Sequence, residues 1–354
     1  MGAYIIAEAG VNHNGSLDMA LDLVNAAAYA GADAVKFQTF KAKKLVQRDA
    51  SKAEYQKKTT CSNESQFKML RRLELSEDDH RKIQSACVKR GINFLSSPFD
   101  EDSLLFLAHN LRLKKIKLGS GEITNAPLLL KAAKENLSVI LSTGMSSLGE
   151  VEMALGCLAF GYMSLENPSR ESLIAAYSDK RARAILREKV TLLHCTSEYP
   201  APLEDVNLNS METMRRAFGL PVGYSDHTSG IWIPLAAVAL GATVVEKHFT
   251  LDKNLSGPDH RASVEPAELA SMIKAIRSVE LALGNGIKSI TPSEKANRQA
   301  VRKHLVFSQD LEAGTVLEEK HLTALRPERG VSPMDLWNVL GQTIRKNIKA
   351  GESF

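Results

Sequence analysis

The amino-acid sequence predicts a (β/α)₈ barrel followed by a small β-rich domain. The length of 354 residues fits a barrel of about 250 residues with an appendage. Short β-rich segments alternate with helical patterns along the first 285 residues, which is typical of parallel strands joined by crossover helices. After Gly284 this alternation stops, which indicates a second domain.

Eight segments are candidate strands, and eight such units favour a closed barrel over an open sheet. The candidates are Tyr4–Ala7, Ala34–Gln38, Asn93–Ser97, Lys115–Leu118, Val139–Ser142, Val190–Cys195, Val222–Ser225 and Thr243–His248. Helical periodicity between them is clear over Leu17–Ala30, which follows the good N-cap Ser16. Ser76 and Asp79 form a capping-box pattern. The polar stretch Tyr162–Glu188 predicts an elaborated loop or extra helices.

The chain is expected to divide into a barrel over residues 1–285, a linker over 286–297 and a small domain over 298–354. The core of such a small domain gives only marginal stability by itself. We therefore expect the second domain to pack on the barrel or on a second protomer. Its candidate strands are His304–Phe307, Thr315–Leu317 and Leu322–Leu325.

Composition excludes several classes of protein. Basic and acidic residues are balanced at 45 and 41 without long basic runs, so nucleic-acid binding has no support. No window approaches the roughly 18 apolar residues of a membrane span, and the N-terminus does not resemble a secretory signal. We therefore expect a cytoplasmic protein with reduced thiols. Its cysteines, which lack CxxC spacing, are Cys61, Cys87, Cys157 and Cys195.

Polar residues occupy the carboxyl ends of the predicted strands, where (β/α)₈ enzymes place their chemistry. His227 and His248 end neighbouring strands, so they are expected to meet at one rim of the barrel. Either histidine alone fits a satisfied core position. Jointly they favour an open divalent metal site, with Mn²⁺ or Mg²⁺ preferred over structural zinc.

Lys36 and Lys117 lie within otherwise apolar strands, where a lysine is costly unless it meets an anion. Phosphate binding explains both, with Ser120 and Ser142 completing the cradle. Lys36 could instead form a structural ion pair with Glu8 or Glu246, and the two interpretations are compatible. Glu8, at the end of the first strand, is the candidate acid or base. The loop after it, Asn12 to Asn14, binds a polyol or orders a turn.

The chain resembles the sialic acid synthases over nearly its whole length. The motifs that carry the resemblance are IAEAGVNHNGS (6–16), VKFQT (35–39), GSGEITN (119–125), LSTGM (141–145), YSDHT (224–228), EKHFT (246–250) and GPDH (257–260). The tail resembles the C-terminal antifreeze-like (SAF) domain of that family through LRPERG (325–330).

The resemblance implies condensation of phosphoenolpyruvate with N-acetylmannosamine or a related N-acetylated sugar. It assigns the metal to His227 and His248, and a place beside the reacting centre to Glu8. The phosphoenolpyruvate contacts that it implies are Lys36, Lys117, Ser120, Ser142 and Ser225, with Ser97 and Ser197 as further contacts. The positions that it places on the sugar side or in support of the metal are Gln38, Glu122, Tyr199, Glu246 and Asp259. It also implies a domain-swapped homodimer in which Arg326 reaches the sugar's N-acetyl group in the partner's site.

Several alternatives remain beside N-acetylneuraminate synthase. The nearest is an N,N′-diacetyllegionaminate synthase that acts on 2,4-diacetamido-2,4,6-trideoxymannose, and the motifs do not separate the two. The pseudaminic acid branch is disfavoured by the GSGE motif at 119–122. A metal-dependent aldolase is a more distant rival. A noncatalytic sugar-binding or ice-binding protein is disfavoured by the complete set of polar strand ends.

Overall fold

The computed structural model of the chain describes residues 2–52, 60 and 64–354. Cys61 lies outside the described residues, and the other cysteines are buried free thiols. Contacts divide the chain into two compact units, Met1–Gly284 and Asn285–Phe354. Among the described residues, no helix is long and apolar enough to cross a membrane.

The first unit is the predicted barrel, in which parallel strands follow the order β3-β2-β1-β8-β7-β6-β5-β4. No ladder of hydrogen bonds joins β3 to β4, so the barrel is nearly closed. The strands are β1 (Tyr4–Gly10), β2 (Ala34–Thr39), β3 (Asn93–Pro98), β4 (Lys115–Leu118), β5 (Ser138–Ser142), β6 (Val190–His194), β7 (Val222–Asp226) and β8 (Val244–His248). All eight strand predictions are confirmed, with ends that differ by a few residues.

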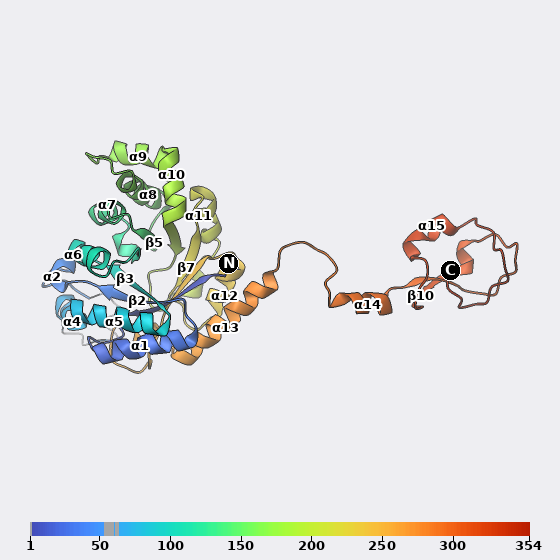
Figure 1. Cartoon of the computed structure of the whole chain (residues 1–354), viewed down its shortest axis with the longest axis horizontal. Helices are drawn as coiled ribbons and strands as arrows, with labels where there is room; N and C mark the ends of the chain where they lie inside the picture. The colour runs from blue at the N-terminus through green and yellow to red at the C-terminus, as the bar shows by residue number, and fades with distance from the viewer. Residues whose placement is uncertain (1, 53–59, 61–63) are drawn as a thin grey trace. The chain divides into compact units, whose positions relative to one another are not determined.

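Helices surround the barrel on its outside (Figure 1). They are α1 (Leu17–Ala30), α2 (Ala42–Leu45), α4 (Gln66–Leu73), α5 (Glu77–Arg90), α6 (Glu101–Leu105), α7 (Ala126–Lys134), α8 (Leu148–Tyr162), α9 (Arg170–Ser178), α10 (Lys180–Lys189), α11 (Ser210–Phe218), α12 (Trp232–Ala239) and α13 (Pro266–Leu283). The Ser16 N-cap and the Ser76–Asp79 capping box are both present. The stretch Tyr162–Glu188 holds α9 and most of α10, so it forms extra helices.

The two-residue period of the strands separates the barrel's core from its mouth. A large apolar cluster fills the space between strands and helices. A smaller one plugs the barrel interior, and its buried members are Ile6, Ala34, Leu95, Ile140, Leu193 and Val244. Two residues beyond a plug residue, the same face of a strand carries a polar side chain. Ile6 thus precedes Glu8, Ala34 precedes Lys36, and Val244 precedes Glu246.

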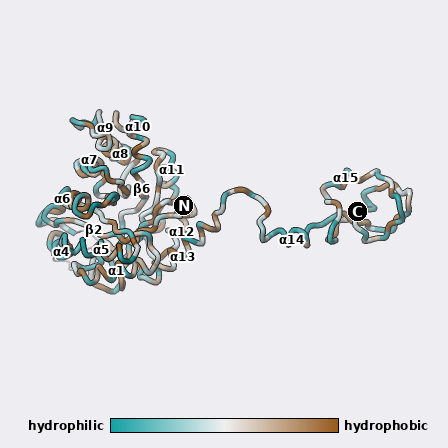
Figure 2. The backbone as a smooth tube through the Cα atoms, in the orientation of Figure 1, coloured by the Kyte–Doolittle hydropathy of each residue, from teal (hydrophilic) through white to brown (hydrophobic). Residues whose placement is uncertain are grey.

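The second unit has one antiparallel pair of strands, β9 (His304–Phe307) and β10 (Leu322–Leu325). Two helices accompany them, α14 (Glu294–Val301) and α15 (Leu336–Val339). The predicted strand Thr315–Leu317 is wrong, because only an isolated bridge joins Val316 to Thr343 beside the turn at Gly314. Part of the predicted linker is the hydrophilic helix α14 (Figure 2). The unit's small core consists of Phe307, Leu311, Leu317, Ile344 and Ile348.

Candidate functional site

A cavity of about 400 Å³ opens at the carboxyl ends of the barrel strands. It brings together all the predicted site residues of the barrel except Ser225. The predicted residues that line it are Glu8, Lys36, Gln38, Ser97, Lys117, Ser120, Glu122, Ser142, Ser197, Tyr199, His227, Glu246, His248 and Asp259. Ser225 lies behind this lining, where its hydroxyl donates to Glu246 Oε1 at 2.9 Å.

Four buried charged side chains form the floor of the cavity. Lys36 Nζ lies 2.6 Å from Glu8 Oε2 and 3.5 Å from Glu246 Oε2, and Lys117 Nζ lies 3.0 Å from Glu246 Oε1. The ion pair that was one interpretation of Lys36 is therefore present. Two ammonium groups and two carboxylates balance one another, which lets them stay buried without an anion. Lys36 also donates to Ser97 Oγ at 3.1 Å.

The two carboxylates differ in their protonation. Burial raises the pKa of Glu8 to about 7 against the opposing effect of Lys36. Burial also acts to raise the pKa of Glu246, but Lys117 and Lys36 together hold it well below its ordinary value. Glu246 therefore stays ionised near neutral pH, whereas Glu8 can exchange a proton there. A residue with that pKa suits acid–base work.

The β4 and β5 ends form a cradle of hydroxyls and close backbone. Gly144 donates its backbone N–H to Ser120 Oγ at 3.0 Å. A Cβ at Gly144 would lie 2.3 Å from Ser197 Oγ and 2.8 Å from Ser120 Oγ, so a larger residue would force these hydroxyls to move. Ser142 Oγ is buried without a hydrogen-bond partner among the described residues, although its side chain lines the cavity. An orphaned hydroxyl in a cavity that Lys117 also lines is suited to an oxyanion of a ligand.

His227 and His248 lie side by side with ring centroids 5.6 Å apart. His227 Nδ1 lies 2.6 Å from the Thr196 carbonyl and must donate to it, which leaves Nε2 as an acceptor. His227 Nε2 lies 3.2 Å from the Tyr199 hydroxyl. His248 Nδ1 is buried with no hydrogen-bond partner among the described residues. Burial lowers the pKa of His227 to about 4 and that of His248 well below its ordinary value.

Two neutral imidazoles fit an open divalent site, because each offers a lone pair and one is already oriented by a carbonyl. Within residues 2–52, 60 and 64–354, no group of three or more His, Cys, Asp and Glu side chains is arranged to hold a metal. His227 and His248 would therefore supply two ligands, with water and substrate oxygens completing the coordination.

Further acidic groups surround the cavity. Burial raises the pKa of Asp259 to about 6. Burial also raises the pKa of Glu122, which accepts a hydrogen bond from Asn125 Nδ2 at 2.7 Å. By contrast, the loop after Glu8 is structural. Asn12 Nδ2 donates to the Phe249 carbonyl at 2.8 Å, which ties the loop to the end of β8.

The sequence missed two features of the site. One is the ion pair of Lys247 with Asp226 at 2.6 Å, buried on the outer face of the barrel strands directly beside His227 and His248. Side chains alternate along β8, so Lys247 lies on the other face of the strand from Glu246. The ion pair of Lys247 with Asp226 could therefore have been predicted from the sequence. The other is an apolar lining contributed by α2 and α4. The sequence did not predict this apolar lining, because α2 and α4 are short helices in a polar stretch of the chain.

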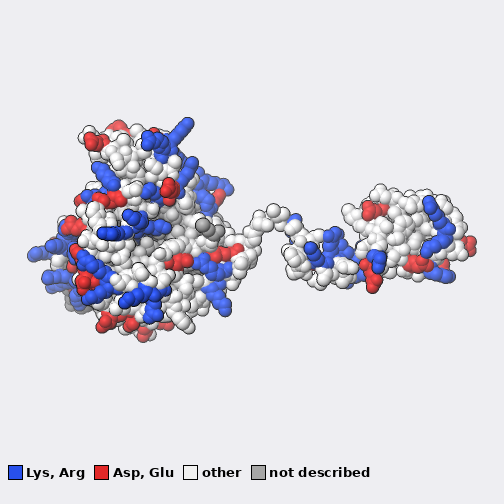
Figure 3. All heavy atoms as spheres, viewed as in Figure 1, with Lys and Arg blue, Asp and Glu red and all other residues white. Residues whose placement is uncertain are grey.

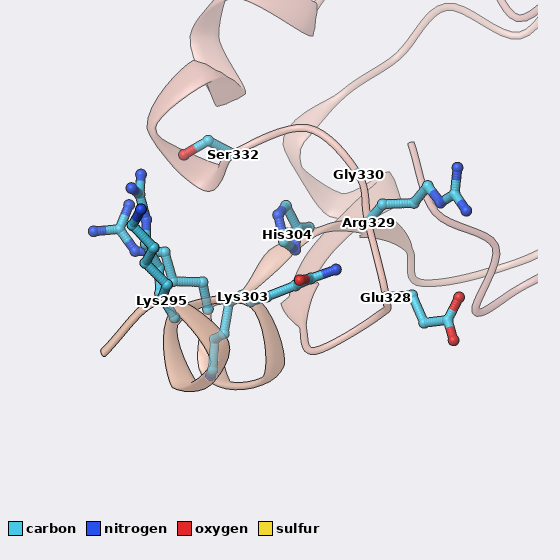
Figure 4. Close-up of a pocket in the computed structure, with 10 residues that line it drawn as sticks. Lys295, Lys303, His304, Glu328, Arg329, Gly330 and Ser332 are labelled. Atoms are coloured by element: carbon cyan, nitrogen blue, oxygen red, sulfur yellow. The ribbon is translucent and has the colours of Figure 1, made fainter. Parts of the chain in front are cut away.

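Arg326, the remaining predicted residue, belongs to the second unit, where it follows β10 and is exposed. That unit has a cavity of its own, of about 380 Å³, which Arg326 does not line. Figure 4 shows His304 of this cavity between Lys295 on one side and Arg329 on the other. Basic side chains gather over α14 in Figure 3. These α14 side chains are exposed, as expected for a solvated helical face.

Known proteins resemble this chain over nearly its whole length. The NeuB family model matches residues 23–288, and the SAF domain model matches residues 302–354. An N,N′-diacetyllegionaminic acid synthase of Campylobacter jejuni is 49% identical over 98% of this chain and 97% of its own length. One of Legionella pneumophila is 44% identical over 99% and 93%. The crystal structure of an N-acetylneuraminic acid synthetase from Leptospira borgpetersenii matches with a TM-score of 0.67 and 32% identity, over 85% of this chain and 93% of that one.

Proposed function

The chain belongs to the NeuB family of phosphoenolpyruvate-dependent nonulosonic acid synthases, and on that premise we propose that it is an N,N′-diacetyllegionaminic acid synthase. Its acceptor is 2,4-diacetamido-2,4,6-trideoxymannose. The observation that carries this choice is the near full-length identity to two synthases of that name, which exceeds the identity to the N-acetylneuraminic acid synthetase. The main interpretation of the sequence was N-acetylneuraminate synthase, although the motifs did not separate the two enzymes, and the comparisons support the alternative better.

The buried charges support the proposed reaction. Lys36 and Lys117 attract the phosphate and carboxylate of phosphoenolpyruvate, while Ser120 and Ser142 donate to its oxygens. The Lys36–Glu8 and Lys117–Glu246 pairs are pre-organised, which holds both ammonium groups in place before the substrate binds. Bringing both substrates into one cavity also removes much of the entropic cost of their encounter.

The chemical step forms one carbon–carbon bond and releases phosphate. C3 of phosphoenolpyruvate attacks the aldehyde carbon of the open-chain sugar, and the resulting cationic C2 captures water. The tetrahedral adduct then expels phosphate to leave a ketone. The two protons of the water end on the new sugar hydroxyl and on the released phosphate. Glu8, whose pKa is about 7, receives the proton from the attacking water.

A divalent cation completes the proposal. His227 and His248 would hold Mn²⁺ or Mg²⁺, and such an ion supplies Lewis-acid polarisation of the aldehyde oxygen when bound. Tyr199, whose ring lies 4.2 Å from that of His227 between centroids, keeps the imidazole in its orientation. We also propose a homodimer in which Arg326 of one protomer completes the sugar site of its partner.

The test is a turnover assay with phosphoenolpyruvate and a panel of N-acetylated sugars, with product mass and released phosphate both measured. We expect the diacetamido sugar to give the highest kcat/KM. A higher kcat/KM with N-acetylmannosamine would assign the chain to N-acetylneuraminate synthesis instead. Turnover with pyruvate in place of phosphoenolpyruvate, and therefore without phosphate release, would indicate an aldolase.

A further inference from the structure

An apolar wall lines one side of the cavity, whose remaining lining is mostly polar but includes Val11, Met145 and Pro258. It consists of Leu45 and Val46 at the end of α2, Met69 and Leu70 on α4, and Phe99 after β3, and the polar residue Gln66 at the start of α4 lines the same cavity. Packing holds the wall in shape. Met69 is 2% exposed within a cluster with Phe40, and the ring of Phe40 contacts that of Phe99 edge to face at 6.3 Å between centroids.

The wall and the two histidines lie on different sides of the barrel mouth, because the wall follows β2 and β3 whereas the histidines lie at the ends of β7 and β8. In the order of the eight strands, β3 is separated from β7 by β2, β1 and β8. The loop after β3 therefore faces the end of β7, which carries His227, across the mouth. A ligand whose reacting end lies at His227 and His248 would extend its other end toward the wall.

Phosphoenolpyruvate is not expected to contact the apolar wall. Its phosphate and carboxylate belong with Lys36 and Lys117, and its one apolar carbon, C3, must face the aldehyde. Both substrates share a cavity of about 400 Å³. The apolar side of that cavity is therefore left to the acceptor sugar, and it requires an apolar group on the end of the sugar that is distant from the aldehyde.

We propose that the apolar wall is a subsite for the C6 methyl group of the acceptor, and that it selects a 6-deoxy sugar over one with a 6-hydroxyl. This inference rests on the proposed function and adds the structural origin of its specificity. A hydroxyl placed against Leu45, Val46 and Leu70 would lose its water, and none of these three side chains could replace the lost hydrogen bond. Apolar pockets discriminate groups of this size by roughly 10-fold to 100-fold in kcat/KM.

The experiment compares two acceptors that differ only at C6, N-acetylmannosamine and 6-deoxy-N-acetylmannosamine. Sugar affinity is measured by calorimetry on the full-length protein without phosphoenolpyruvate, and kcat/KM is measured with it. The wild type should prefer the 6-deoxy sugar by roughly 10-fold or more in both measurements. The variants Leu70→Asn and Val46→Thr should bring the ratio toward one, while the KM for phosphoenolpyruvate stays unchanged.

Val46→Thr nearly preserves the volume of the side chain, so it keeps the test decisive even where Leu70→Asn fails to fold. Leu240→Ala is the matched control, because Leu240 is 49% exposed and follows α12 on the outside of the barrel. An affinity ratio near one in the wild type, or one that Val46→Thr leaves unchanged, would overturn the proposal. A clear affinity preference without turnover of any sugar would refute the proposed function and leave the subsite standing.

Discussion

The Lys36 ammonium lies 2.6 Å from the Glu8 carboxylate, and both side chains are only 2% exposed. The pair joins neighbouring strands, because Glu8 of β1 and Lys36 of β2 are partners in the parallel register. A buried pair of this kind is costly to break. Its place at the carboxyl end of the barrel connects the fold to the chemistry.

Glu8→Gln should lower kcat by roughly 10²-fold to 10⁴-fold, because the amide cannot take a proton from the attacking water. The raised pKa of Glu8 can be measured by infrared spectroscopy. A neutral carboxylic acid should give an infrared band at acidic pH that disappears as the pH rises through about 7, and Glu8→Gln should lack it. Below that pH, kcat/KM of the wild type should fall, because protonated Glu8 cannot accept a proton from the attacking water. A difference spectrum without this band would contradict the assignment.

Lys117→Ala should raise the KM for phosphoenolpyruvate far more than that for the sugar, since the phosphate loses a buried cation. We expect a decrease in kcat/KM of roughly 10-fold to 100-fold, because a lost charged hydrogen bond is worth roughly 1.5–3 kcal/mol. Lys115→Ala on the same strand is the control, because Lys115 is exposed outside the cavity. Equal damage to the apparent affinities of both substrates would count against phosphate binding by Lys117.

Chelation should abolish turnover, and Mn²⁺ or Mg²⁺ should restore it. Mn²⁺ binding, followed by electron paramagnetic resonance, should be lost in His227→Ala and in His248→Ala. His109→Ala should bind Mn²⁺ normally, because His109 is exposed and pairs with Glu135. Full activity in metal-stripped protein would refute the metal proposal.

Lys247→Met should destabilise the barrel by roughly 3–5 kcal/mol, because it leaves Asp226 buried without its partner. Lys247 also donates to the Thr228 carbonyl, so the loop that carries His227 should loosen. Urea unfolding measures the loss. Lys253→Ala breaks the half-exposed pair with Glu268 and should cost at most about 1 kcal/mol. Equal decreases in the free energy of unfolding of the two variants would show that the buried Lys247 pair stabilises the protein no more than the half-exposed pair.

Mixing inactive Glu8→Ala protomers with Arg326→Ala protomers tests the dimer. If Arg326 acts in the partner's site, each mixed dimer has one site with both residues intact, and activity should return. Arg329→Ala is the control, since it should retain activity alone. Absence of recovery after demonstrated subunit exchange would refute the arrangement.

The amino-acid sequence alone was sufficient for the barrel and for the identity of its polar strand ends. A period of two is a local property, so Ile6 and Glu8, or Val244 and Glu246, could be assigned to one face before their neighbours were known. The cost of placing a lysine in an apolar strand led to Lys36, with an ion pair to Glu8 or Glu246 as one interpretation. The second unit was less predictable, because a small core with many turns leaves short strands such as Thr315–Leu317 weakly specified.

Only the tertiary structure decided which groups meet and in what state. Glu8 and Glu246 have the same side chain, and yet burial raises the pKa of Glu8 while two lysines depress that of Glu246. The apolar wall likewise joins α2, α4 and the loop after β3, which are distant in the sequence. Desolvation and electrostatic interaction depend on distances across the fold, whereas strand periodicity depends on neighbours along the chain. This is why the sequence predicted most of the polar residues that line the cavity, but not their protonation states or the apolar wall.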